Sequence, residues 1–304
     1  MAAKGASAGR GRSADVHKRA AVEVSDRGGR DGRLRQNLVF TLFGTYVLPE
    51  PRPVWSGGVV QALEDLGFTT AAAQIALSRL VRKGYLSRIK DGRRIYLEMA
   101  DELRRVLMEG EQRIFSFGSP QPVSSTWTLL SYSIPEELRA ERDRLRKRLS
   151  FLGFGSIHDG FWFTPRERVD GVVKLLDELG LTPYAEIFRG SPAGGADVSS
   201  LIERAWSVER VKQLYDAYVE EFGPYRNAAT RQRLPDRDAF RIRTRAVHQF
   251  RQFVELDPEL PGPSAEQESR RRAVETFREV YDALAEIAQS YFDRITQVGT
   301  PVRA

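Results

Sequence analysis

Apolar residues recur every three or four positions along much of this chain, which is the spacing of the buried face of an α-helix. Shorter apolar stretches, rich in β-branched and aromatic residues, indicate strands between these helices. The pattern predicts helices at 34–47, 59–66, 70–83, 101–117, 135–152, 169–179, 201–222, 238–253 and 264–295. It predicts strands at 85–88, 94–97, 127–134, 153–164 and 182–188.

Two stretches rich in Pro, Ser and Gly, at 118–125 and 191–195, separate these elements into three groups. We therefore expect an α+β multidomain protein with domains at 33–118, 119–190 and 191–304. The middle group reads strand, helix, strand, helix, strand, which is typical of a small ferredoxin-like α+β domain. The last group is mostly helical.

The first 32 residues are rich in Gly, Ala, Ser and Arg and show no apolar period, so they are predicted to be a disordered tail. Residues 1–37 contain nine Lys or Arg and four Asp or Glu, whereas the whole chain has a net charge of +6. Most of the basic character therefore lies in this tail. It can attract phosphates in a salt-dependent way, or it can be a dispensable extension.

Residues 69–96 combine a helix with a hairpin. Thr69 or Thr70 can cap the helix, Gly84 can end it, and Asp91-Gly92 is predicted to be the turn between the two strands. The exposed face of the helix and the hairpin contain seven Lys or Arg between positions 74 and 96, against Asp91 alone. A helix of this kind fits the DNA major groove and a cationic hairpin reaches flanking phosphates, so we expect a winged helix-turn-helix. The alternative is a solvated helix face beside a charged turn.

The DNA-binding residues predicted from this segment lie on the helix face opposite its apolar stripe and along the hairpin. They are Thr70, Gln74, Ile75, Ser78, Arg79, Arg82, Lys83, Arg88, Lys90, Arg93 and Arg94.

Composition excludes several classes of protein. The chain has no Cys, so it has no disulfide, no thiolate metal site and no cysteine nucleophile. It shows neither a signal peptide nor an apolar run as long as a membrane helix, so we expect a cytoplasmic protein without a membrane partner.

Several segments, in this order, resemble the PaaX-like family, the repressors of phenylacetate-degradation operons. They are LVFTLFGTYVLP, ALSRLVRKGYL followed by GRRIY, YSIPEELR, LRKRLSFLGFG, DGFWFTP and AFRIRTRAVHQFRQFVELDPELP. The resemblance covers 34–295. It implies a dimeric repressor bound to double-stranded operator DNA and released by an aryl-CoA thioester, usually phenylacetyl-CoA.

The chain differs from this family at three places. It has Gln74-Ile75 where relatives tend to have Arg-Thr, Thr45 where an aspartate is usual, and GPSAEQESRRRA after LDPELP. Because of the first difference, the operator sequence need not be the one usual in the family. Because of the last difference, the same holds for the effector.

Motifs for catalysis are missing from the sequence. The histidines are His17, His158 and His248, and no zinc pattern, Walker loop or nucleophile elbow occurs. The middle domain also resembles small CRISPR-associated ferredoxin-like nucleases, which would need a carboxylate at the end of the first strand to hold Mg²⁺. This chain has Ser131-Tyr132-Ser133 there. We therefore predict that the protein is not an enzyme and has no cofactor and no metal site. There are two alternatives: a metal-dependent nuclease, or a winged-helix module that binds only proteins.

Five residues are candidates for effector binding, between the central and C-terminal domains. His158 and Trp162 are predicted to share one strand and one face, and can line an aryl pocket or be a surface His and a packed Trp. Arg243, His248 and Arg251 match the family pattern and can meet CoA phosphates, or form helix salt bridges instead. The helix at 264–295 is either core or a homodimer interface.

Overall fold

The computed structural model describes residues 29–119, 126–194, 197–257, 259 and 265–297. Residues 1–28 of the tail predicted at 1–32 lie outside the described residues. Helix α2 begins at Gly29, five residues before its predicted start, so the prediction was wrong for 29–32.

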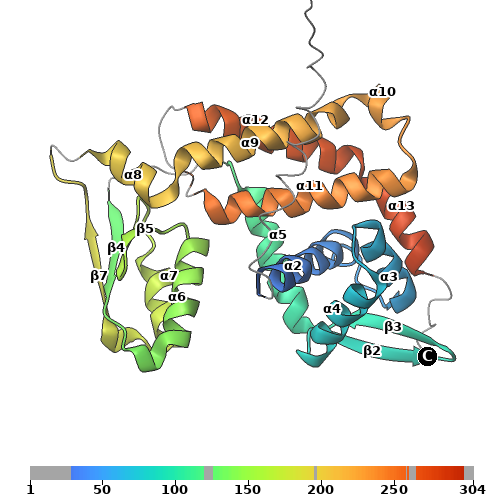
Figure 1. The fold of residues 1–304 in the computed structure, drawn as a ribbon, viewed down its shortest axis with the longest axis horizontal. Helices are drawn as coiled ribbons and strands as arrows, with labels where there is room; N and C mark the ends of the chain where they lie inside the picture. The colour runs from blue at the N-terminus through green and yellow to red at the C-terminus, as the bar shows by residue number, and fades with distance from the viewer. Residues whose placement is uncertain (1–28, 120–125, 195–196, 258, 260–264, 298–304) are drawn as a thin grey trace, which may run out of the picture.

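The described chain is a mixed α+β protein with two small antiparallel sheets and a helical C-terminal part (Figure 1). The elements of the N-terminal group are α2 (Gly29–Tyr46), β1 (Val54–Trp55), α3 (Ser56–Asp65), α4 (Thr70–Arg82), β2 (Leu86–Asp91), β3 (Arg94–Met99) and α5 (Asp101–Ser116). Strand β1 was not predicted, because residues 49–53 read as a proline-rich connector. It pairs with β3 and gives a three-stranded sheet in the order β1-β3-β2.

The central group forms a four-stranded antiparallel sheet with two helices on one face (Figure 1). Its elements are β4 (Trp127–Tyr132), η1 (Glu136–Leu138), α6 (Arg139–Phe151), β5 (Gly155–His158), β6 (Phe161–Thr164), α7 (Val169–Glu178), η2 (Thr182–Tyr184) and β7 (Ala185–Gly190). The strand order is β5-β6-β4-β7. The single strand predicted at 153–164 was wrong: Asp159 and Gly160, with Gly160 at φ +80°, turn the chain into a hairpin of β5 and β6.

The C-terminal group is helical: α8 (Val198–Trp206), α9 (Val208–Phe222), η3 (Gly223–Arg226), α10 (Ala228–Arg231), α11 (Asp236–Leu256), α12 (Ala265–Ala283) and α13 (Ala285–Thr296). Two helices predicted as continuous are each broken once. The break between α8 and α9 lies at Ser207, whose φ of 52° is left-handed, and Leu284 separates α12 from α13.

The N-terminal group shares its core with the C-terminal helices. Phe240, Tyr291 and Phe292 of α11 and α13 pack in the same apolar cluster as residues of α2, α3, α4 and the sheet. Helix α3 lies so close to the end of α13 that a Cβ on Gly58 would be 1.9 Å from the carbonyl oxygen of Ile295. A change in the packing of α11 and α13 therefore directly alters the packing of α2 and α3.

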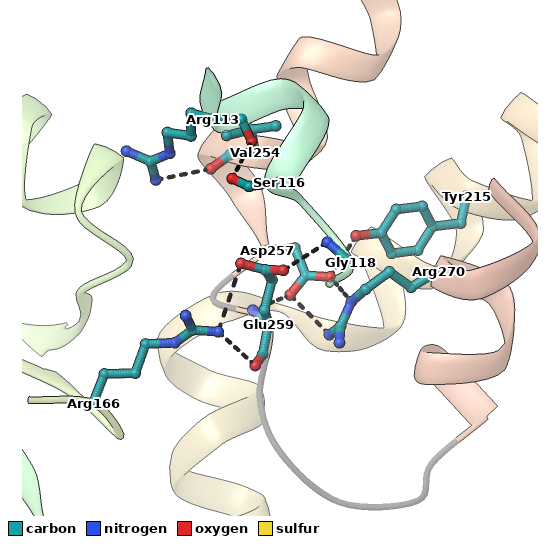
Figure 2. A network of polar contacts seen from close by, with 9 residues as sticks. All are labelled: Arg113, Ser116, Gly118, Arg166, Tyr215, Val254, Asp257, Glu259 and Arg270. Carbon is teal, nitrogen blue, oxygen red and sulfur yellow. Dashed lines mark hydrogen bonds and ion pairs between the residues drawn. The ribbon is translucent and has the colours of Figure 1, made fainter. Parts of the chain in front are cut away.

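A buried polar network joins the end of α5, the central group and the C-terminal helices (Figure 2). Asp257 forms a two-pronged ion pair with Arg270 and accepts a hydrogen bond from the Tyr215 hydroxyl. Glu259 accepts from the Gly118 amide at 2.8 Å, and its carbonyl accepts from Arg166 at 2.8 Å. Burial raises the pKa of Tyr215 well above its usual value, so the phenol remains a donor to Asp257.

Candidate nucleic-acid interface and interhelical pocket

Helix α4 is fixed at both ends by its own sequence. Thr69 caps it, because its side-chain oxygen accepts from the Ala72 amide at 3.2 Å. At the other end the amides of Gly84 and Tyr85 donate to the carbonyls of Val81 and Leu80, both at 3.0 Å. This is a Schellman ending, and Gly84 supplies the left-handed residue with φ +74°.

The hairpin follows immediately in the register Leu86↔Met99 to Asp91↔Arg94. The two loop residues are therefore Gly92 and Arg93 rather than the predicted Asp91-Gly92, since Asp91 is already paired. Gly92 has φ +56° and occupies the first loop position, which matches a type II′ turn.

All eleven residues predicted to bind DNA are exposed, on α4 or on the hairpin. Ala73, Leu77 and Leu80 on the opposite face of α4 are buried in the core. The Arg88 guanidinium donates to Ser78 Oγ at 3.3 Å and so ties β2 to α4. The structure therefore exposes all of these residues on two elements that are linked to each other, and together they carry a strong excess of positive charge.

Ile75, on the exposed face of α4, is 54% exposed. More than half of its side-chain surface is therefore left uncovered by the other described elements. A large apolar side chain in this position is unfavourable in water, so it is a candidate for contact with a partner.

His158 and Trp162 do not form a common pocket, and the prediction that they share a strand was wrong. His158 ends β5 and is exposed, whereas Trp162 lies on β6 and is 7% exposed within the core of the central group. The missed turn at Asp159 and Gly160 is the physical reason.

Arg243, His248 and Arg251 all lie on α11, and the structure brings them together beside α2 rather than beside the central group. Arg243 is buried: its Nε donates to the Tyr281 carbonyl at 3.0 Å and its guanidinium lies 4.0 Å from the centre of the Tyr281 ring. Arg251 donates to Thr41 Oγ1 at 3.1 Å, and His248 Nδ1 lies 3.4 Å from the same oxygen.

The pKa of His248 is lowered to about 4, first by burial and second by the neighbouring Arg251 charge. His248 is therefore neutral at physiological pH.

Arg251 also lines a pocket between α2, α5 and α11, with about 490 Å³ of atom-free space including its open mouth. We call it the α2–α5–α11 pocket. Its walls include Phe40, Thr41, Gly44 and Thr45 of α2, Gly110, Glu111 and Phe115 of α5, Val247 and Arg251 of α11, and Tyr281 of α12. Burial raises the pKa of the Glu111 carboxyl.

Apart from Arg251, sequence reasoning missed every residue of this pocket. The helices that form it were predicted, but their mutual packing was not. The available signal was Gly44 and Gly110, two glycines inside predicted helices, where glycine is disfavoured without a local reason.

Three family models match this chain in sequence order. The model for the PaaX-like protein matches residues 35–103, that for the PaaX protein central Cas2-like domain matches 120–202, and that for the PaaX-like protein C-terminal domain matches 206–294. The chain belongs to the PaaX-like family.

A curated relative of this PaaX-like chain is the transcriptional repressor PaaX of Escherichia coli (strain K12). It is 26% identical over 231 residues, which are 74% of this chain and 72% of the relative. A solved structure, the uncharacterized protein Rv0674 from Mycobacterium tuberculosis, has a TM-score of 0.51 at 17% identity. The match covers 84% of this chain and 96% of that one, and it supports the fold alone.

The family assignment confirms the prediction that the chain is not an enzyme, because the PaaX-like family is one of regulators and is not known as enzymatic. In the parts of the chain that the structure describes, no helix is both long and apolar enough to cross a membrane.

Proposed function

We propose that this PaaX-like protein is a DNA-binding transcriptional repressor that reads its operator with α4. The exposed cationic surface of α4 and the β2–β3 hairpin supports this proposal most directly, together with the curated relative named as a transcriptional repressor. In this proposal the N-terminal group is a winged helix-turn-helix. Helix α4 enters the major groove, and the hairpin is the wing beside it.

We propose domains at 33–118, 119–190 and 191–304. The connectivity β4-α6-β5-β6-α7-β7 with strand order β5-β6-β4-β7 supports a ferredoxin-like central domain. The apolar core formed by α5, α9, α11 and α12 supports a helical C-terminal domain. We propose a cytoplasmic protein, because its proposed partner is operator DNA.

We propose further that an aryl-CoA thioester such as phenylacetyl-CoA releases the repressor, as the family resemblance implies. The repressor should bind as a twofold dimer to an inverted repeat, because one recognition helix contacts only a few base pairs. Sedimentation velocity with and without operator DNA tests the dimer. A monomer in both measurements would contradict it.

The decisive experiment is a gel shift on DNA upstream of the gene, with two variants of equal charge change. Arg82→Glu with Lys83→Glu reverses two charges on α4, whereas Arg144→Glu with Lys147→Glu reverses two exposed charges on α6. We expect the first to abolish binding and the second to leave it near wild type. Equal losses, or no binding by the wild-type protein, would overturn the proposal.

A further inference from the structure

We propose that Asp65 is a positioning residue for DNA reading, which together with Tyr291 and Arg237 holds the end of α3 at the turn into α4. Arg237 and Tyr291 lie 172 and 226 positions further along the chain, so α11 and α13 of the C-terminal group become part of the unit that reads DNA. This inference rests on the proposed repressor function. It adds residues outside α4 and the hairpin on which operator recognition depends.

Asp65 is a buried carboxylate held between three helices. It is the last residue of α3, and its side chain is 5% exposed. Its Oδ1 accepts from Nε of Arg237 on α11 at 2.7 Å, and its Oδ2 accepts from the hydroxyl of Tyr291 on α13. Burial, and next the hydrogen bond to Asp65, raise the pKa of Tyr291 to about 12, so the phenol keeps its proton and donates. Both carboxylate oxygens are therefore fixed by the C-terminal helices.

Helix α3 itself gives no reason for an acidic residue at this position. The C-terminal end of a helix carries partial negative charge, so an aspartate there is unfavourable. Burial of a carboxylate costs further free energy unless the group is paired and hydrogen-bonded. Apolar packing could stabilise the same contact equally well. The carboxylate is therefore better explained by the direction that its hydrogen bonds to Arg237 and Tyr291 impose on α3.

A second contact fixes the opposite end of α3, which lies beside α13 (Figure 1). A Cβ on Gly58 would lie 1.9 Å from the Ile295 carbonyl oxygen, so the first turn of α3 packs directly on the backbone of α13. Arg294 of α13 forms an ion pair at 2.9 Å with Asp236 at the start of α11. Helices α11 and α13 are thus joined to each other, and together they contact α3 at both of its ends.

The position of α3 determines that of α4, because backbone hydrogen bonds close the turn between them. The Gly67 amide donates to the Glu64 carbonyl at 2.9 Å. The Phe68 amide donates to the Leu63 carbonyl at 3.0 Å. Base contacts require α4 at one depth and angle in the groove, whereas phosphate contacts carry no sequence information. Loss of the contacts to Asp65 should therefore lower the affinity for operator DNA more than the affinity for unrelated DNA.

The first test compares two substitutions in the full-length protein that each remove one buried hydroxyl. Tyr291→Phe removes the donor to Asp65 and keeps the ring, which packs against Phe240. Tyr218→Phe is the matched control, because its hydroxyl is also buried and donates to the Ala246 carbonyl at 3.2 Å within the core of the C-terminal group. Fluorescence anisotropy at one fixed salt concentration measures the affinity of each protein for DNA upstream of the gene and for unrelated DNA of the same length.

We expect Tyr291→Phe to lower operator affinity at least about tenfold, because α3 is then correctly placed in only a fraction of the molecules. Its affinity for unrelated DNA should stay near wild type, since the exposed cations are unchanged. A variant that was only less stable would lose affinity for both DNAs in the same proportion. Asp65→Asn should show the same selective loss. Its control is Asp257→Asn, because Asp257 also binds an Arg and a Tyr but joins α11 to α12 and α9 rather than to α3.

The second test measures amide hydrogen exchange without DNA. Tyr291→Phe should speed exchange in α3 and in the turn that follows it, whereas Tyr218→Phe should not. Unchanged exchange in α3 overturns the positioning role of Asp65. An unchanged ratio of operator to unrelated DNA affinity does so too, in whichever of Tyr291→Phe and Asp65→Asn folds as judged by its thermal transition.

An equal selective loss in the control variants also overturns the role, because the effect would then follow general stability. If the wild-type protein does not bind DNA upstream of the gene, the proposed repressor function fails, and the role of Asp65 in DNA reading fails with it. The exchange measurement still decides separately whether Asp65 and Tyr291 fix α3.

Discussion

Asp257 and Arg270 form a buried ion pair in which Nε lies 2.6 Å from Oδ2 and Nη2 lies 2.9 Å from Oδ1. The two side chains are 0% and 10% exposed. They join the end of α11 to α12, beside the segment that contacts the central group (Figure 2). Removing one charge from such a pair leaves the other uncompensated in a poorly solvated site.

Arg270→Met should therefore lower the free energy of unfolding by about 3–5 kcal/mol, measured by urea denaturation. Arg271→Met is the control, because Arg271 is on the same helix but its partners Glu268 and Glu275 are exposed. We expect little change there. Adding Asp257→Asn to Arg270→Met should restore part of the loss. If Arg270→Met and Arg271→Met lowered the free energy of unfolding equally, burial of the ion pair would not determine its contribution to stability.

His248 should give the protein a pH-dependent stability. Its pKa is about 4 in the folded protein and 6.5 when unperturbed, so the unfolded chain binds more protons in between. Stability from this group is complete above pH 6.5 and is lost as the pH falls toward 4, by up to roughly 3 kcal/mol.

In His248→Asn the side-chain amide can occupy the position of Nδ1 beside Thr41. This substitution should remove the part of the pH dependence of the free energy of unfolding that comes from His248. Denaturation curves of both proteins between pH 7 and 4 measure it. The acid slope from carboxylates should persist in both. Parallel stability profiles would contradict the role of His248.

Most helices of this fold could be predicted because periodicity is a local property of the sequence. The predicted 101–117 and 169–179 match α5 and α7 within one residue at either end. Strand β1 could not be predicted in this way, because its two residues become a strand only by pairing with β3. The break at Leu284 was hidden for a related reason, since apolar residues continue at helical spacing through it.

The candidate site was predictable where side chains face outward and much less so where helices pack. The exposed face of α4 could be predicted from the spacing of the apolar residues within that helix. The position of Arg243 does not, because Tyr281 and Tyr46, which cover its guanidinium, are 38 and 197 residues away in the sequence. The α2–α5–α11 pocket likewise exists only because three helices from distant segments meet.

Arg93 and Arg94 should contact phosphates rather than bases, because they lie at the tip of the hairpin. Arg93→Ala with Arg94→Ala should weaken binding to every DNA sequence and reduce the salt slope by about two units or less. Fluorescence anisotropy on operator and unrelated DNA, over a series of salt concentrations, measures both quantities. A loss restricted to one base-pair position would show instead that these arginines read sequence.

Gln74 and Ile75 should set the base preference of α4. Both are exposed on the face opposite Ala73 and Leu77, and the Ile75 side chain is free to cover a thymine methyl group. Gln pairs best with the N6 and N7 of adenine, whereas Arg pairs with the O6 and N7 of guanine. The half-site should therefore favour A·T at the steps these residues contact. Gln74→Arg with Ile75→Thr should move the preference toward G·C by about 1–3 kcal/mol for each two-pronged contact. Binding-site selection on both proteins at one fixed salt concentration measures the shift, with Gln252→Arg at an exposed position of α11 as a control for added charge. The same consensus from all three proteins would mean that neither side chain reads a base.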